Sequence, residues 1–279
     1  MTAKVPKLGF WFIHRTPLFE EPRATRVTQL LTDDRWPWLP NIVRPTQFPG
    51  RELYPWKGTA RGKTARTALP FVVGDVLRSE LTDGVCVVTS RIDTTNHGWF
   101  DINSGRAALR HEGIAYPFDA IGMCSTAVPP GKNINDWLAV MRELAETLQI
   151  GHGIICAEAD ERWTRVRIFL SGGLPQPRMP QDFPANETTR VLNVRREMGQ
   201  RYVRPPAWAT FLRRAHLDAV GGRDHLLATV QPPVVHDLGD LLYLQLSTSV
   251  EDALAPETEA RRRALAELLA PITVPPLIF

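Results

Sequence analysis

The segment 133–157 constrains the fold more than any other part of the sequence. Its apolar side chains recur at intervals of three and four residues, as on one face of a helix: Trp137, Met141, Leu144 and Leu148. Asn133 or Asn135 can cap this helix at its N-terminus. The run from Gly151 to Ala157 follows directly and is typical of a buried strand. The sequence therefore predicts a helix that packs against a sheet.

Shorter patterns of both kinds lie on either side of this segment. Helices are predicted after Pro22, around 71–81 and 188–200, before Val220, and from Pro256 onward. Residues 35–70 are rich in tryptophan and proline, have no clear period, and predict a long irregular segment. Further strands are predicted at residues 8–13, 85–92, 99–102, 114–125, 207–212 and 241–248. Strands and helices mix without a regular βαβ rhythm, which indicates an α+β fold with mixed, mainly antiparallel sheets packed with helices.

One stretch of the chain has the composition of a connection. Residues 172–187 contain two glycines and four prolines, which favour a linker or a long surface excursion. This divides the chain into an α+β N-terminal part, 1–171, and an α+β C-terminal part, 188–279. The two parts form either separate units or one compact domain.

Charge and hydropathy exclude some classes of protein. The net charge is +3 and the pI is about 8.9, which is too mildly basic to indicate nucleic-acid binding by itself. No apolar run approaches the roughly 20 residues needed to span a bilayer, and the N-terminus has no signal-peptide pattern. We therefore expect a cytoplasmic protein that does not enter a membrane. Cys86, Cys124 and Cys156 lie far apart in apolar surroundings, so reduced, buried thiols are expected.

Motifs of known catalytic sites are missing from the sequence. The segment from Gly58 to Thr64 resembles a phosphate-binding loop, but only three residues separate its glycines where four are needed. The seven histidines do not fall at short metal-ligand spacings, and no lysine has a glutamate two residues before it, as a restriction-type nuclease would require. His152, between two glycines, fits a hydrogen-bonded structural imidazole. The sequence thus predicts a protein that is not an enzyme and has no catalytic residue, metal or cofactor.

The segment 190–214 leaves an alternative open. It contains seven arginines interleaved with Tyr202, Trp208 and Phe211. Basic residues mixed with aromatic residues can bind single-stranded nucleic acid. An arginine-bearing helix followed by a half-buried strand explains the same pattern, and this interpretation makes direct nucleic-acid binding the less favoured one. A nucleic-acid or phosphate-binding module remains the alternative function.

Both ends of the chain resemble immunity protein family 52. The N-terminal resemblance is carried by the aromatic strand Gly9–Phe12 with Arg15, by Arg23–Val27 with Leu30 and Leu31, and by Trp36 or Trp38. The C-terminal resemblance is carried by Trp208–Leu212, a short helix, a strand ending near Val235, Asp240–Leu246, and a final helix with Ala264 and Leu268.

The resemblance implies a function in interbacterial competition. Such proteins bind the toxin encoded beside them, here a nuclease effector of type VI secretion with a restriction-endonuclease-like domain. A chain with net positive charge is a poor mimic of DNA, so we expect contact away from the toxin's DNA groove. Aromatic and arginine side chains often dominate interface energy. The candidate anchors are Trp36, Trp38, Trp56, Arg195 and Arg196, and the three tryptophans are alternatively core residues.

Overall fold

The computed structural model describes residues 7–14, 21–36, 42–47, 60–61, 74, 85–91, 97–103, 119–124, 134–158, 197 and 199–273. Its helices, of which α3 is the longest, are α1 (Arg23–Leu31), α3 (Ile134–Leu148), α6 (Arg214–Ala219), α7 (Arg223–Val230) and α8 (Pro256–Leu269). Two short 3-10 helices, Glu251–Leu254 and Ala270–Ile272, flank α8. None of the described helices is both long and apolar enough to cross a membrane.

The described strands form one ten-stranded sheet in the order β3-β2-β4-β5-β6-β1-β7-β8-β10-β9. The strand bounds are β1 (Lys7–His14), β2 (Ile42–Gln47), β3 (Ala60–Arg61), β4 (Val85–Arg91), β5 (His97–Asn103), β6 (Asp119–Cys124), β7 (His152–Glu158), β8 (Ala209–Arg213), β9 (Val234–Leu238) and β10 (Leu241–Gln245). Every pairing between these strands is antiparallel. The α+β class with mainly antiparallel strands is confirmed.

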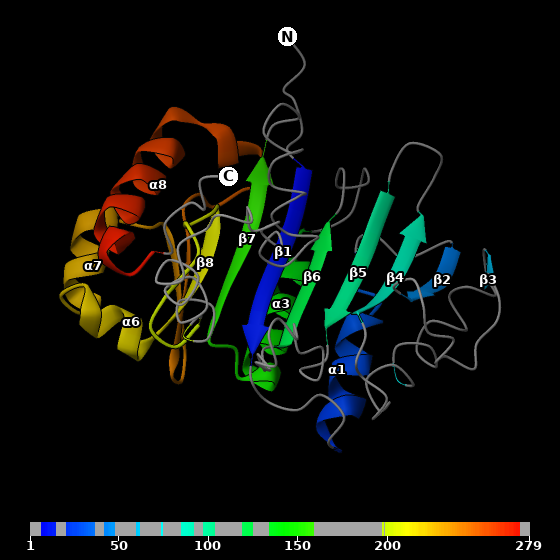
Figure 1. Cartoon of the computed structure of the whole chain (residues 1–279). Helices are drawn as coiled ribbons and strands as arrows, with labels where there is room; N and C mark the ends of the chain where they lie inside the picture. Colours follow the sequence, from blue (N-terminus) through cyan, green and yellow to red (C-terminus); the bar gives the residue numbers. More distant parts are fainter. Residues whose placement is uncertain are drawn as a thin grey trace, which may run out of the picture.

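The faces of the sheet carry different helices (Figure 1). Because successive side chains of a strand point to opposite faces, Leu8, Phe10 and Phe12 of β1 lie on one face, where they pack with α1 and α3. The predicted helix face at Trp137 is fully buried in this core. On the other face, Leu212 of β8 and Leu242 of β10 pack against α6, α7 and α8. The core therefore has two layers, one on each face of the sheet. We call the layer with α1 and α3 the first core and the layer with α6, α7 and α8 the second core.

The prediction of an irregular segment at residues 35–70 was wrong in part. That segment contributes β2 and β3, although it was expected to be irregular. Pro45 lies within β2, paired with Val88 of β4. A proline is tolerated at an open edge, and β3 reaches only as far as Ile42 and Val43. The remaining residues of β2, including Pro45, therefore have a described strand on one side alone.

The predicted connection 172–187 lies outside the described residues. On either side of it, β7 pairs with β8 from His152↔Leu212 to Ile155↔Ala209. A strand of the N-terminal part thus hydrogen-bonds directly to a strand of the C-terminal part. The helices predicted at 71–81 and 188–200 also fall almost entirely outside the described residues.

Candidate functional site

Trp36 is a core residue. Its side chain is 1% exposed, and its ring lies 6.1 Å from that of Phe10 and 6.0 Å from that of Trp137. Its Nε1–H donates to the carbonyl oxygen of Leu30 at 2.6 Å, one of the carbonyls that the end of a helix leaves unpaired. Trp36 therefore ends α1 and offers no side-chain surface to a partner. The other candidate anchors, Trp38, Trp56, Arg195 and Arg196, lie outside the described residues.

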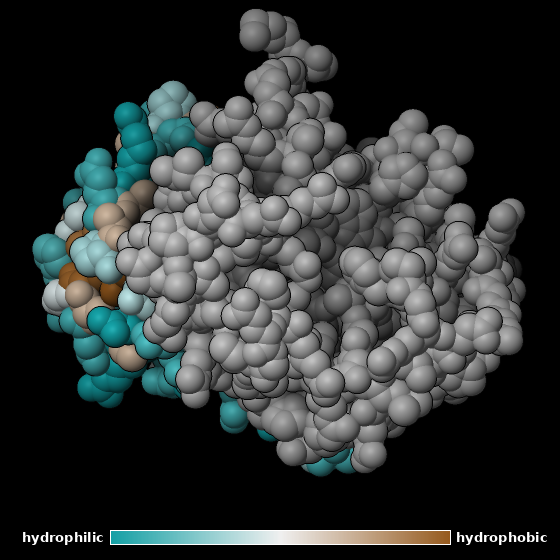
Figure 2. Space-filling model, in the orientation of Figure 1, coloured by the Kyte–Doolittle hydropathy of each residue, from teal (hydrophilic) through white to brown (hydrophobic). Residues whose placement is uncertain are grey.

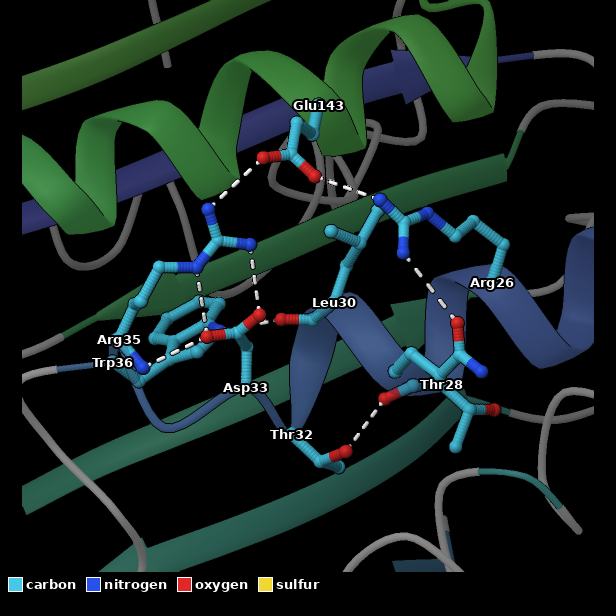
Figure 3. A network of polar contacts seen from close by, with 9 residues as sticks. Arg26, Thr28, Leu30, Thr32, Asp33, Arg35, Trp36 and Glu143 are labelled. Carbon is cyan, nitrogen blue, oxygen red and sulfur yellow. Dashed lines mark hydrogen bonds and ion pairs between the residues drawn. The ribbon is translucent and has the colours of Figure 1, made fainter.

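A polar network joins α1 to α3 on the outside of this core (Figure 3). Glu143 of α3 accepts from Arg26 at 2.8 Å and from Arg35 at 2.9 Å. Arg35 also donates to Asp33 at 2.8 Å, and this hydrogen bond lowers the pKa of the Asp33 carboxyl. Two positive and two negative side chains balance one another, so the network has no surplus charge with which to attract a ligand.

The residues that carry the N-terminal family resemblance fall in this region. Arg26 forms the network, Leu30 and Leu31 are buried, and Trp36 caps the helix. These are packing and capping roles. The described residues of the N-terminal motif therefore indicate how α1 packs against α3 and do not mark a binding site.

Buried polar side chains gather on the opposite face of the sheet. The guanidinium of Arg204 lies 3.7 Å from the ring centroid of Trp11, a cation–π contact. His152 donates from Nδ1 to the Phe211 carbonyl at 2.8 Å, and its ring is 6.1 Å from both Trp11 and His216. The register explains this cluster, because β1 and β7 pair Ile13 with His152 and place Trp11 one step away on the same face.

Burial holds these histidines neutral. It lowers the pKa of His152 to about 3, with His216 and Arg204 adding to the effect and the hydrogen bond to Phe211 opposing it. It also lowers the pKa of His216 to about 4 and that of Arg204 to about 9. The structural role predicted for His152 is confirmed. Cys156, predicted as a buried thiol, is buried; the side chains of Cys86 and Cys124 are not described.

The chemistry of this cluster depends on whether a ligand can reach its side chains. Neutral imidazoles can bind metals or accept protons, but His152 is fully buried. Across the described ranges, no three side chains of the metal-binding types His, Cys, Asp and Glu come together. The Nε2 atom of His152, the Nε1 atom of Trp11 and the Oγ1 atom of Thr210 have no hydrogen-bond partner there. The cluster is a polar inclusion in the second core. Sequence reasoning missed it because its members come from segments far apart in the chain.

The Arg-rich segment 190–214 is described from residue 199 onward and at 197. Trp208 and Phe211, which a stacking platform would have to expose, are buried in the core. Arg204 is 1% exposed, and Arg213 pairs with Asp240 at 2.8 Å. Arg201, which lies over the ring of Tyr202, and Arg214 remain exposed. The described part of this segment therefore keeps some cationic surface but buries two of its three aromatic side chains, on which bases would have to stack.

Comparisons with known proteins add a structural likeness. No family model and no curated protein matches the chain. A solved structure described as Pseudomonas aeruginosa T6SS protein PA0821 is similar over 96% of this chain and 73% of its own length, with a TM-score of 0.54 and 15% sequence identity. The two chains share a fold. At this identity the likeness concerns the arrangement of helices and strands and not their side chains.

Proposed function

We propose that this chain is an immunity protein, which binds and neutralises a cognate bacterial toxin in the cytoplasm of the producing cell. The observation that carries the proposal is the fold shared with a T6SS protein across nearly the whole chain. The family resemblance at both ends of the sequence supports the same function. The proposed partner is a nuclease effector of type VI secretion with a restriction-endonuclease-like domain.

The proposed mechanism is stoichiometric occlusion without turnover. A protein that protects by binding needs a rigid scaffold and a complementary surface, and has no need of a catalytic site. The ten-stranded sheet with helices packed on both faces supplies such a scaffold. The buried histidines and Arg204 lie inside it, away from any partner, so binding is assigned to the outer surface.

Co-expression with the product of the neighbouring gene tests the proposal. That product alone should arrest the growth of a laboratory host, and this chain should restore it. A purified assay sharpens the test, because nuclease activity should fall linearly and reach zero at one chain per toxin. Protection at far lower ratios would indicate an enzyme. A neighbouring product that is harmless alone, or that still kills beside the folded chain, would show that the proposed function is wrong.

Heparin chromatography tests the alternative function. An immunity protein of this charge should elute at low salt. Tight retention that collapses steeply with salt would favour nucleic-acid binding by the segment 190–214 instead.

A further inference from the structure

The strand β9 ends the sheet. It pairs with β10 from Leu241↔Leu238 to Gln245↔Val234 and is the last strand in the sheet order. Gly239 and Asp240 form the two-residue turn between them. The φ of +66° at Gly239 suits the first central position of such a turn. β9 is therefore held in place by a tight hairpin on one side only.

Backbone hydrogen bonds show which groups of β9 point outward. The Asp240 carbonyl accepts from Arg214, and the Leu246 N–H donates to Trp208. Even-numbered residues of β10 thus bond toward β8, and odd-numbered ones toward β9. Their partners in β9 are residues 234, 236 and 238. The N–H and C=O groups of Val235 and Asp237 therefore point away from the sheet, where no described strand meets them.

The side chains beside this open edge are partly apolar on both faces of the sheet. Val234 and Leu238 pack at the margin of the α1–α3 core and remain partly exposed. On the other face, Val235 and Leu227 of α7 both pack at the margin of the second core. Figure 2 shows a small hydrophobic patch over α7 and α8, within a mostly hydrophilic surface. An added strand would cover apolar surface on both sides of the edge.

One face of the edge is cationic. Arg142 of α3 lies over the ring of Tyr243, 5.4 Å from its centroid. The ring of His236 lies 5.8 Å from the same ring, and burial together with Arg142 lowers the pKa of His236, so it is neutral near pH 7. Antiparallel pairing of two copies through β9 would place both Arg142 side chains on the same face, because a two-fold axis normal to the sheet keeps each face on its own side. Like charges disfavour that arrangement, and a carboxylate would be attracted to it.

On the other face, the Asp237 charge is already matched. Its carboxylate accepts from Arg223 at 3.0 Å. Charged side chains on an edge strand oppose its pairing with a further strand. On this face of β9, Arg223 neutralises the charge of Asp237, so this opposition is weak.

We propose that β9 is the docking edge for the toxin: an extended segment of the toxin adds to the sheet beside β9, with apolar side chains along the edge and an acidic side chain facing Arg142 and His236. This inference rests on the proposed function. The main-chain groups of Val235 and Asp237 supply affinity, and the alternating side chains supply specificity.

Val235→Pro tests the main-chain part of the proposal. An edge strand tolerates proline, which removes an N–H that points outward, so the variant should fold. It also loses the partly buried valine side chain, as the alanine variant does, so both should melt slightly below wild type. Its affinity for an inactivated toxin should fall on the order of 100-fold, through the lost hydrogen bond and the blocked approach. The matched control Val235→Ala keeps the N–H and should lose less than about tenfold.

The charge is tested on the other side of the edge. Arg142→Met keeps an apolar stem over Tyr243 and should weaken toxin binding by about tenfold, because the carboxylate loses its partner. Arg263→Met removes one exposed arginine of α8 and should leave binding unchanged. Equal loss in both variants would overturn the assignment of the acidic side chain.

Amide exchange provides a readout that does not depend on substitution. The amides of Val235 and Asp237 should exchange rapidly in the free chain and become protected in the complex. If wild type binds the toxin and Val235→Pro binds equally well, the docking edge is wrong and the proposed function stands. If wild type does not bind, the proposed function fails. A free chain that is dimeric, and that Val235→Pro makes monomeric, would assign the edge to a second copy and overturn the proposal.

Discussion

At the scale of single residues, the second core carries ionisable groups that its packing keeps neutral. His152 and His216 are both buried, and burial holds their pKa values at about 3 and about 4. In the unfolded chain both rings would titrate near the ordinary value of 6.5. Folding therefore excludes two protons at mildly acidic pH.

We predict that stability falls as pH drops below about 6.5. In that window the unfolded chain binds protons that the folded chain refuses, so the free energy of unfolding decreases by about 1.4 kcal/mol per pH unit for each histidine. The loss continues down to about pH 4, where His216 begins to protonate in the folded state. Urea unfolding at pH 7, 6 and 5 measures it. The variant His216→Gln should show a shallower slope, and an unchanged slope would contradict the assignment.

Gly151 gives a steric prediction at the same scale. A Cβ atom at this position would lie 2.3 Å from the carbonyl oxygen of Gly199, a backbone atom that cannot turn aside. We expect Gly151→Ala to lower the free energy of unfolding by about 3 kcal/mol or more, the upper end of the range that is typical of overpacked sites. Gly222→Ala separates strain from clash, because its φ is +92° but no atom lies within 4 Å of the added carbon. Thermal unfolding should show the larger loss for Gly151→Ala.

At the scale of elements, α3 holds the first core together. Its face from Trp137 to Leu148 packs against β1, and its outer side bonds to α1 and Arg35 through Glu143. The two sides of α3 contribute differently to the stability of the fold. The inner face is fully buried, whereas Glu143 and its arginine partners are 37–50% exposed, where solvent screens an ion pair.

We predict that Trp137→Ala costs about 3–5 kcal/mol in the free energy of unfolding, because it empties a large site in a close-packed core. Glu143→Ala, on the same helix, serves as the control and should cost less than about 1 kcal/mol. Denaturant unfolding of both variants makes the comparison. A melting temperature for Trp137→Ala within a degree or two of wild type would refute it.

How much of this could be predicted from the sequence depended on periodicity. The apolar face of α3 is long and regular, and both α3 and β7 lie where the sequence places them. The helix α7 was missed because only Leu226 and Val230 of its eight residues are buried, which leaves almost no stripe to recognise. β2 was missed because Pro45 argues against a strand unless one edge is known to be open. The docking edge proposed for β9 depends on sheet order, which no local pattern encodes.

At the scale of the whole molecule, charge bears on how a partner is recognised. The chain is only mildly basic, with a net charge of +3, and several of the described surface charges form ion pairs with one another. Association with the proposed toxin should therefore depend on shape and main-chain pairing more than on long-range attraction.

We predict that toxin affinity changes by less than about tenfold between 50 and 300 mM salt, where the Debye length shortens from about 14 to about 6 Å. Calorimetry or surface binding at these two salt concentrations measures it. A fall of several orders of magnitude would instead mean that the chain occupies the toxin's DNA groove through carboxylates.

The central place of β1 in the sheet has a consequence for the chain while it is being synthesised. β1 is near the N-terminus, yet it lies between β6 and β7, and its partners reach as far as Glu158. A ribosome adding about 5–20 residues per second needs on the order of 10–30 s to make the intervening chain. Until β6 and then β7 have been made, β1 lacks the two strands between which it lies. A newly made copy thus passes through an interval in which β1 is open to aggregation and proteolysis.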